Sequence, residues 1–120
     1  MGLDMYAYRV KPHPENTQFS FEGEKEDLAY WRKFNALHGW MEKLYNGLGG
    51  EDQFNCIPLR LTPEIIDALE KDIEHLSPIP GFFFGPQEYT EDDKDEVRNF
   101  ISNCRGIFAS GDEVYYVSWW

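Results

Sequence analysis

A chain of 120 residues fits one domain, and its contents of 42% hydrophobic and 28% charged residues are typical of a globular protein rather than a disordered one. The net charge of −11 is uneven: residues 1–50 carry seven acids and six bases, whereas residues 51–120 carry fifteen acids and five bases. Acidic surfaces repel phosphate groups, so direct nucleic-acid binding and attachment to an anionic membrane are disfavoured. A basic protein partner or mimicry of a nucleic acid is permitted, and the same charge can serve solubility alone.

The N-terminal part is predicted to form a strand and then a long helix. Residues 3–10 alternate apolar side chains on two faces, which indicates a strand, and Pro12 and Pro14 interrupt regular structure after it. A helix is predicted from residue 26 to residue 46, because apolar residues recur there at steps of three and four. These residues are Tyr30, Phe34, Leu37, Met41, Leu44 and Leu48. Acids at its start and glycines after its end fit such a helix.

A second strand and a second helix follow. Residues 54–61 include the predicted strand, in which Pro58 suits a sheet edge. Thr62 and Pro63 predict the cap and the first position of a helix that continues to about Leu76.

The last third of the chain begins with an apolar run at residues 81–86, which is either a buried strand or a loop that plugs the core. Thr90 then caps a third predicted helix, with Asp93 at the capping-box position. Residues 114–120 form the last predicted strand. This order of elements predicts an α+β fold. We expect residues 1–120 to form a single domain, in which about three helices pack on one face of a small mixed or antiparallel sheet.

The sequence also indicates the cellular compartment and whether metal or redox sites are expected. It holds no run that resembles a signal peptide or a membrane span, and Cys56 and Cys104 match no metal or redox spacing. We therefore expect a cytoplasmic protein with reduced thiols, no membrane partner, no metal and no cofactor.

The most informative segment is residues 30–41, within the predicted first helix. Arg32, Asn35 and His38 lie at helical spacing there, flanked by Trp31 and Trp40. A guanidinium, an amide and an imidazole can together hold a carboxylate or a phosphate, so these five residues are a candidate ligand-binding site. Alternatively, Asn35 and His38 belong to a buried polar network that only stabilises the fold.

The acidic start of the predicted third helix is a candidate surface for a basic protein partner. Its members are Glu91, Asp92, Asp93, Asp95 and Glu96. The simpler interpretation is that these acids complement the helix dipole in a solvated first turn. The terminal Trp119 and Trp120 allow two interpretations: they are covered by a central strand, or they lie at a sheet edge where a homodimer forms through the C-terminal strand.

Four segments together resemble a family of small uncharacterised proteins encoded by tailed phages and prophages. They are residues 1–6 (MGLDMY), residues 30–40 with the pattern YWRK-N-H-W, residues 81–85 (GFFFG) with Tyr89, and residues 115–119 (YYVSW). The resemblance spans nearly the whole chain. It implies a phage or prophage origin and a host-cytoplasm setting, and it supplies no catalytic residues.

Three functions are compatible with these features. The favoured one is a non-enzymatic accessory protein that binds a host protein, and an inhibitor of a host defence system that presents an acidic surface is one concrete version. The alternative is a small-molecule or nucleotide-binding domain, with or without enzymatic activity, whose site lies on the first helix. The third is a structural homodimer.

Overall fold

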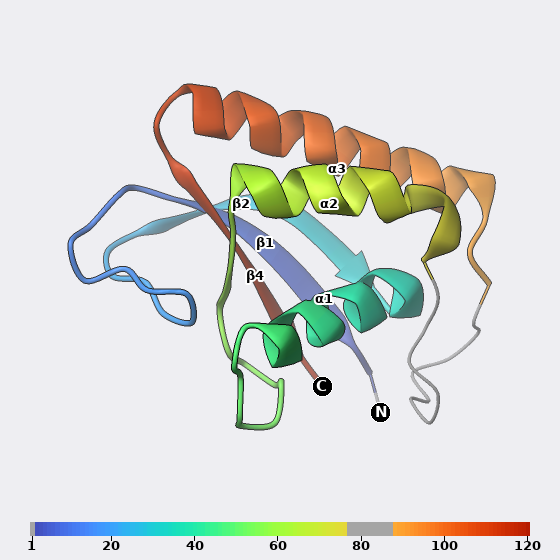
Figure 1. Cartoon of the computed structure of the whole chain (residues 1–120), viewed down its shortest axis with the longest axis horizontal. Coiled ribbons are helices and arrows are strands. Elements are labelled where there is room, and N and C mark those ends of the chain that lie inside the picture. Colours follow the sequence, from blue (N-terminus) through green and yellow to red (C-terminus); the bar gives the residue numbers. More distant parts are fainter. Residues whose placement is uncertain (1, 77–87) are drawn as a thin grey trace.

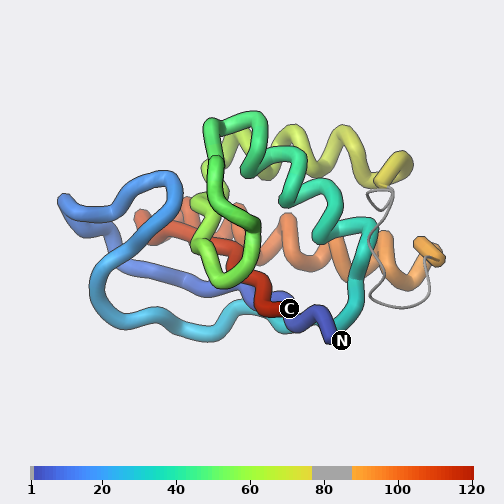
Figure 2. The backbone as a smooth tube through the Cα atoms, turned by 90° about the horizontal axis from the view of Figure 1, so that it is seen from below, coloured from blue at the N-terminus to red at the C-terminus, as the bar shows by residue number. Residues whose placement is uncertain are grey.

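The computed structural model describes residues 2–76 and 88–120, which fold into a four-stranded antiparallel sheet with helices on one side (Figures 1 and 2). The predicted α+β class is confirmed. The elements are β1 (Asp4–Val10), β2 (Lys25–Arg32), α1 (Asn35–Gly47), β3 (Leu59–Leu61), α2 (Pro63–Asp72), the 3-10 helix η1 (Ile73–His75), α3 (Glu91–Ala109) and β4 (Glu113–Trp119). No helix in these residues is long and apolar enough to cross a membrane.

The strand order is β2-β1-β4-β3, and every neighbouring pair is antiparallel. The register places Tyr6 of β1 opposite Tyr30 of β2 and opposite Val117 of β4. The last strand of the chain therefore lies inside the sheet, because β1 and β3 flank it. The edge position predicted from Pro58 is confirmed for β3, which begins at Leu59.

The predicted helix over residues 26–46 is wrong in its first part. Residues 25–32 form β2, which pairs with β1 along its whole length, and α1 begins only at Asn35. Lys33, with φ of 56°, turns the chain between the two elements. In β2 the buried Trp31 stands between the exposed Tyr30 and Arg32, which is the period of a strand and not of a helix.

The helix starts predicted from capping residues are confirmed. The Thr62 side chain accepts a hydrogen bond from the Ile65 N–H, and Thr90 and Asp93 form a complete capping box. The second helix ends at Asp72 and continues as η1, and the second strand is only three residues long. The apolar run at residues 81–86 lies outside the described residues.

The core lies between the helices and one face of the sheet. Met5, Tyr116 and Leu59 of the sheet pack there with side chains of all three α-helices, such as Leu37, Leu69 and Phe100. Trp31 joins this core from β2, with its ring centroid 5.0 Å from that of Phe100. The opposite face of the sheet carries a smaller cluster of buried side chains, Tyr8, Val10 and Tyr115, and is otherwise open.

Candidate functional site

The five residues of the predicted ligand site lie on two elements and in different environments. Trp31 and Arg32 belong to β2, where Trp31 points into the core and Arg32 points to solvent. Asn35 and His38 lie on α1 and are 6% and 2% exposed, so they are buried. Trp40 lies further along α1, and its Nε1–H donates to the Asp72 carboxylate at 2.9 Å. The structure therefore does not bring these five side chains to one surface.

A buried polar cluster joins α1 to β4. The Nδ1 atom of His38 lies 2.7 Å from the hydroxyl oxygen of Tyr116, and its Nε2 atom lies 3.9 Å from a carboxylate oxygen of Glu42. Ser118 lies two residues further along β4, and its buried hydroxyl partly offsets the rise that burial causes in the pKa of Tyr116. The imidazole also stacks on the Phe54 ring, with centroids 5.6 Å apart and planes 11° apart. His38 is thus held on three sides by other side chains.

Burial sets the charge state of this cluster. Desolvation lowers the pKa of His38 from 6.5 to about 4, and it raises the pKa of Tyr116 well above 10. Both side chains are therefore uncharged at pH 7. Burial also raises the pKa of Glu42. An imidazole this deeply covered is out of reach of a ligand in solution, so the arrangement favours a network that fastens α1 to the sheet.

Tyr116 and Ser118 are members of this cluster that the sequence did not assign to any site. Residues 116 and 118 lie on the same face of any strand, because side chains alternate between the two faces. Nothing in a single sequence indicated that this face would meet His38, which is 78 residues earlier in the chain.

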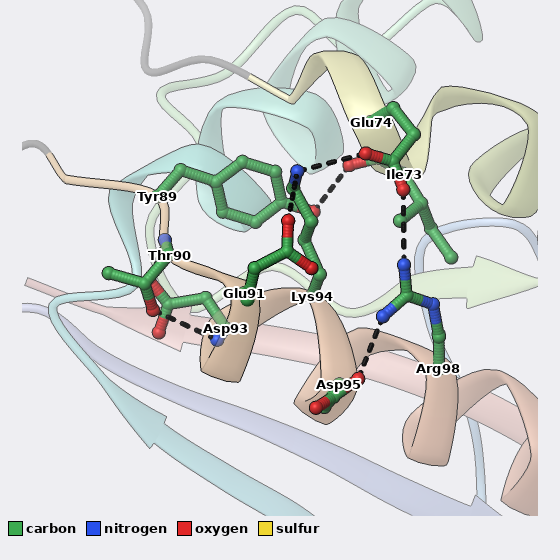
Figure 3. A network of polar contacts seen from close by, with 9 residues as sticks. All are labelled: Ile73, Glu74, Tyr89, Thr90, Glu91, Asp93, Lys94, Asp95 and Arg98. Carbon is green, nitrogen blue, oxygen red and sulfur yellow. Dashed lines mark hydrogen bonds and ion pairs between the residues drawn. The ribbon is translucent and has the colours of Figure 1, made fainter.

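Several acids at the start of α3 form hydrogen bonds or ion pairs within the protein (Figure 3). Asp93 caps its own helix, since its carboxylate accepts from the Thr90 N–H at 2.9 Å. Lys94 bridges the carboxylates of Glu91 at 3.0 Å and Glu74 at 2.9 Å. These bonds tie the first turn of α3 to η1.

The same pattern continues along the helix pair. Arg98 bonds Asp95 at 2.7 Å and Glu74 at 3.0 Å, and it extends the network drawn in Figure 3. Arg105 bonds Glu70 and Asp67 of α2, each at 2.9 Å. The paired cations hold the pKa values of Glu70 and Glu74 below the usual range for a glutamate.

These basic side chains do not neutralise all the acids of the helices that they join. The helices α2, η1 and α3 together carry ten acidic and four basic side chains, a net charge of −6. The helices α2 and α3 lie side by side on one side of the sheet (Figure 1). Their negative charge therefore lies on the outer face of this helical side of the molecule. We call this surface, made by the solvent-facing side chains of α2, η1 and α3, the acidic layer.

Residues predicted for two separate sites meet at one hollow beside the acidic layer. Trp31 and Arg32 line it from β2, and Asp93 and Glu96 line it from α3. Its volume is about 370 Å³. The basic end of β2 therefore borders the acidic start of α3.

The chain was compared with known proteins. It matches no family model, no curated protein and no solved structure. Within residues 2–76 and 88–120, no three His, Cys, Asp or Glu side chains are grouped to hold a metal ion.

The predicted homodimer cannot form by adding a strand at the edge of β4, because both edges of β4 are occupied. β1 pairs with it along its length, and β3 pairs with its first half. Beyond β3, the Cys56 N–H donates to the Ser118 carbonyl at 2.7 Å. The Asn55 side chain then bonds both the N–H and the carbonyl of Trp120. A second copy would have to displace these bonds.

Proposed function

We propose that this protein is a non-enzymatic accessory protein of a phage or prophage that binds a basic surface of a host protein through the acidic layer. The observation that supports this proposal is the net charge of −6 on three adjacent helical elements. Mimicry of a nucleic acid requires the acids to form one surface, and the side-by-side packing of α2 and α3 supports this arrangement. The resemblance to phage proteins supplies the host-cell setting.

Ion pairs within the layer favour a defined arrangement of charge. Lys94 and Arg98 each bond one carboxylate of α3 and Glu74 of η1. Arg105 of α3 bonds two carboxylates of α2. These contacts fix the bonded carboxylates relative to one another. Asp92 and Glu96 are exposed and are not among the acids bonded by these three bases. They can therefore meet a basic partner without breaking the helix pair, and a fixed charge pattern favours a specific partner.

The alternative, a small-molecule site built on Arg32, Asn35 and His38, has less support. Two of these three side chains are buried, and His38 is bonded within the fold. We therefore assign no catalytic residue.

The experiment compares the protein with a charge-reversed variant. The immobilised chain and the double variant Asp92→Lys/Glu96→Lys are exposed to a host-cell lysate, and any captured protein is purified and titrated. We expect the variant to bind it at least about tenfold more weakly, and we expect binding by the parent to fall steeply with salt.

The matched control reverses two exposed acids away from the acidic layer, Glu22→Lys/Glu24→Lys, with the same change in net charge. It should bind as the parent does. If control and variant lose equal affinity, only net charge matters and the proposed site is wrong. If the affinity of the parent does not change with salt, electrostatic docking is refuted.

A further inference from the structure

The side of the sheet that faces away from the helices carries an exposed aromatic patch. Residues that lie directly opposite each other in paired strands point to the same face. Tyr6 therefore shares this face with Tyr30, whose ring centroid is 5.2 Å away, and with Val117. Trp119 lies next to them, opposite Asp4. We call Tyr6, Tyr30, Val117 and Trp119 the aromatic patch.

The patch is unusually open to solvent. Tyr30 is 56% exposed and Trp119 is 61% exposed. They are two of the three large hydrophobic side chains that are exposed in the described part of the chain, and the third, Leu48, lies at the end of α1. Single exposed apolar side chains are common, but tryptophan and tyrosine gathered beside an arginine are typical of the centre of a protein interface.

The charge of this face differs from that of the rest of the molecule. By the strand register, its charged side chains are three acids and three bases. They are Asp4, Asp27 and Glu113, and Lys25, Arg32 and Arg60. The face is therefore neutral, whereas the acidic layer lies on the far side of the sheet. Two copies that meet at this face keep their acidic layers apart, so their net charges oppose association least in this orientation.

The face is also complementary to itself. Asp4 and Arg32 are direct neighbours across β1 and β2, so the patch presents an anion and a cation side by side at its rim. Asp4 is oriented by the Tyr30 hydroxyl, which donates to it at 2.7 Å. A two-fold axis that runs between β1 and β2, parallel to them, would set Asp4 of one copy against Arg32 of the other twice. The same axis would set Tyr6 of each copy against Tyr30 of the other, beside the two ion pairs.

We propose that the chain forms a homodimer in which two aromatic patches pack face to face around a two-fold axis. The strands have seven, eight, three and seven residues. At about 3.4 Å per residue and about 4.8 Å between strands, they give a face of roughly 400 Å² per copy. The total of roughly 800 Å² lies below the range of stable interfaces, so the dimer is weak and depends on concentration. It carries one acidic layer at each end, which offers two binding surfaces at once.

The first experiment is sedimentation equilibrium of the whole chain from micromolar to about millimolar concentration, where weak dimers of this size are populated. We expect the average mass to rise from 14.1 kDa toward that of a dimer. Trp119→Ser should abolish the rise, whereas the matched change of the exposed Leu48→Ser should leave it. A mass that stays at 14.1 kDa throughout overturns the proposal and favours another protein as the occupant. A rise that survives Trp119→Ser overturns it as well.

The second experiment tests the ion pairs by exchange. Asp4→Arg and Arg32→Asp should each weaken the dimer at least about tenfold, because each places two like charges together twice. The double variant Asp4→Arg/Arg32→Asp should restore it. If the double variant dissociates as the single variants do, the two-fold arrangement is wrong. Far-UV circular dichroism of each variant confirms that the change lies in association and not in folding.

Discussion

Acid should destabilise this protein through His38. The folded state keeps the imidazole neutral with a pKa of about 4, whereas the unfolded chain has the ordinary value of 6.5. Between these values the unfolded state binds more protons than the folded state, so stability rises with pH and falls as the pH drops from about 6.5 toward 4. The full difference of 2.5 pKa units corresponds to about 3.4 kcal/mol, and about 2 kcal/mol of it should be lost between pH 7.5 and pH 5.

The assay is urea denaturation of the parent and of His38→Gln at pH 7.5 and pH 5, because the pH dependence separates a titrating histidine from one that only packs. The raised pKa of Glu42 acts in the opposite direction, since a carboxyl that protonates more readily when folded gains stability in acid. Both chains retain Glu42, so the difference between their pH dependences isolates His38. We expect the parent to lose about 2 kcal/mol more than His38→Gln.

The control variant is His75→Gln, which removes an exposed histidine from η1. It should keep the pH dependence of the parent. The reasoning is refuted if the parent and His38→Gln lose the same free energy between the two pH values. In that case the imidazole is not held neutral by burial against Tyr116, and α1 is fastened to the sheet in some other way.

Three further predictions test the helix cap, a close contact and the cysteines. Thr90→Ala should lower the free energy of unfolding by about 1 kcal/mol in urea denaturation, because α3 loses its cap, and an unchanged value would contradict the capping box. Gly50→Ala should cost about 1–3 kcal/mol in the same assay, since the added Cβ would overlap the Tyr45 ring, and a neutral result would show that the ring moves freely aside. A thiol reagent at pH 8 should modify the exposed Cys56 and spare Cys104, whose pKa is raised to about 12 by burial. Mass spectrometry of the labelled chain decides the last point, and rapid double labelling would show that Cys104 is not buried in solution.

The first predicted helix shows where local patterning failed. Tyr30, Phe34 and Leu37 are spaced as on a helix, and the acids before them fit a helix start. Residues 25–32 nevertheless form a strand, and pairing with β1 decided between the helix and the strand there. Strand pairing depends on a neighbour that is distant in sequence, so no local pattern contains it.

The candidate sites also differ in whether local sequence could predict them. The acids at the start of α3 were identified from the sequence, because a capping box and a charged first turn are local features. The partner of His38 on β4 was not, since Tyr116 comes from the other end of the chain. The aromatic patch was not predicted either. Tyr6 and Tyr8 share a face of any strand that contains both. Which face the helices leave open, however, depends on packing.

Local sequence features were enough to predict the α+β class, the capped starts of α2 and α3 and the concentration of acids in the second half of the chain. These features rest on interactions between residues a few positions apart. Three features follow from long-range packing instead: residues 25–32 are a strand, β4 is central, and the acidic layer and the aromatic patch lie on opposite sides of the sheet. Each of these depends on which distant segments pack together to bury apolar surface, and that choice is made by the whole chain at once.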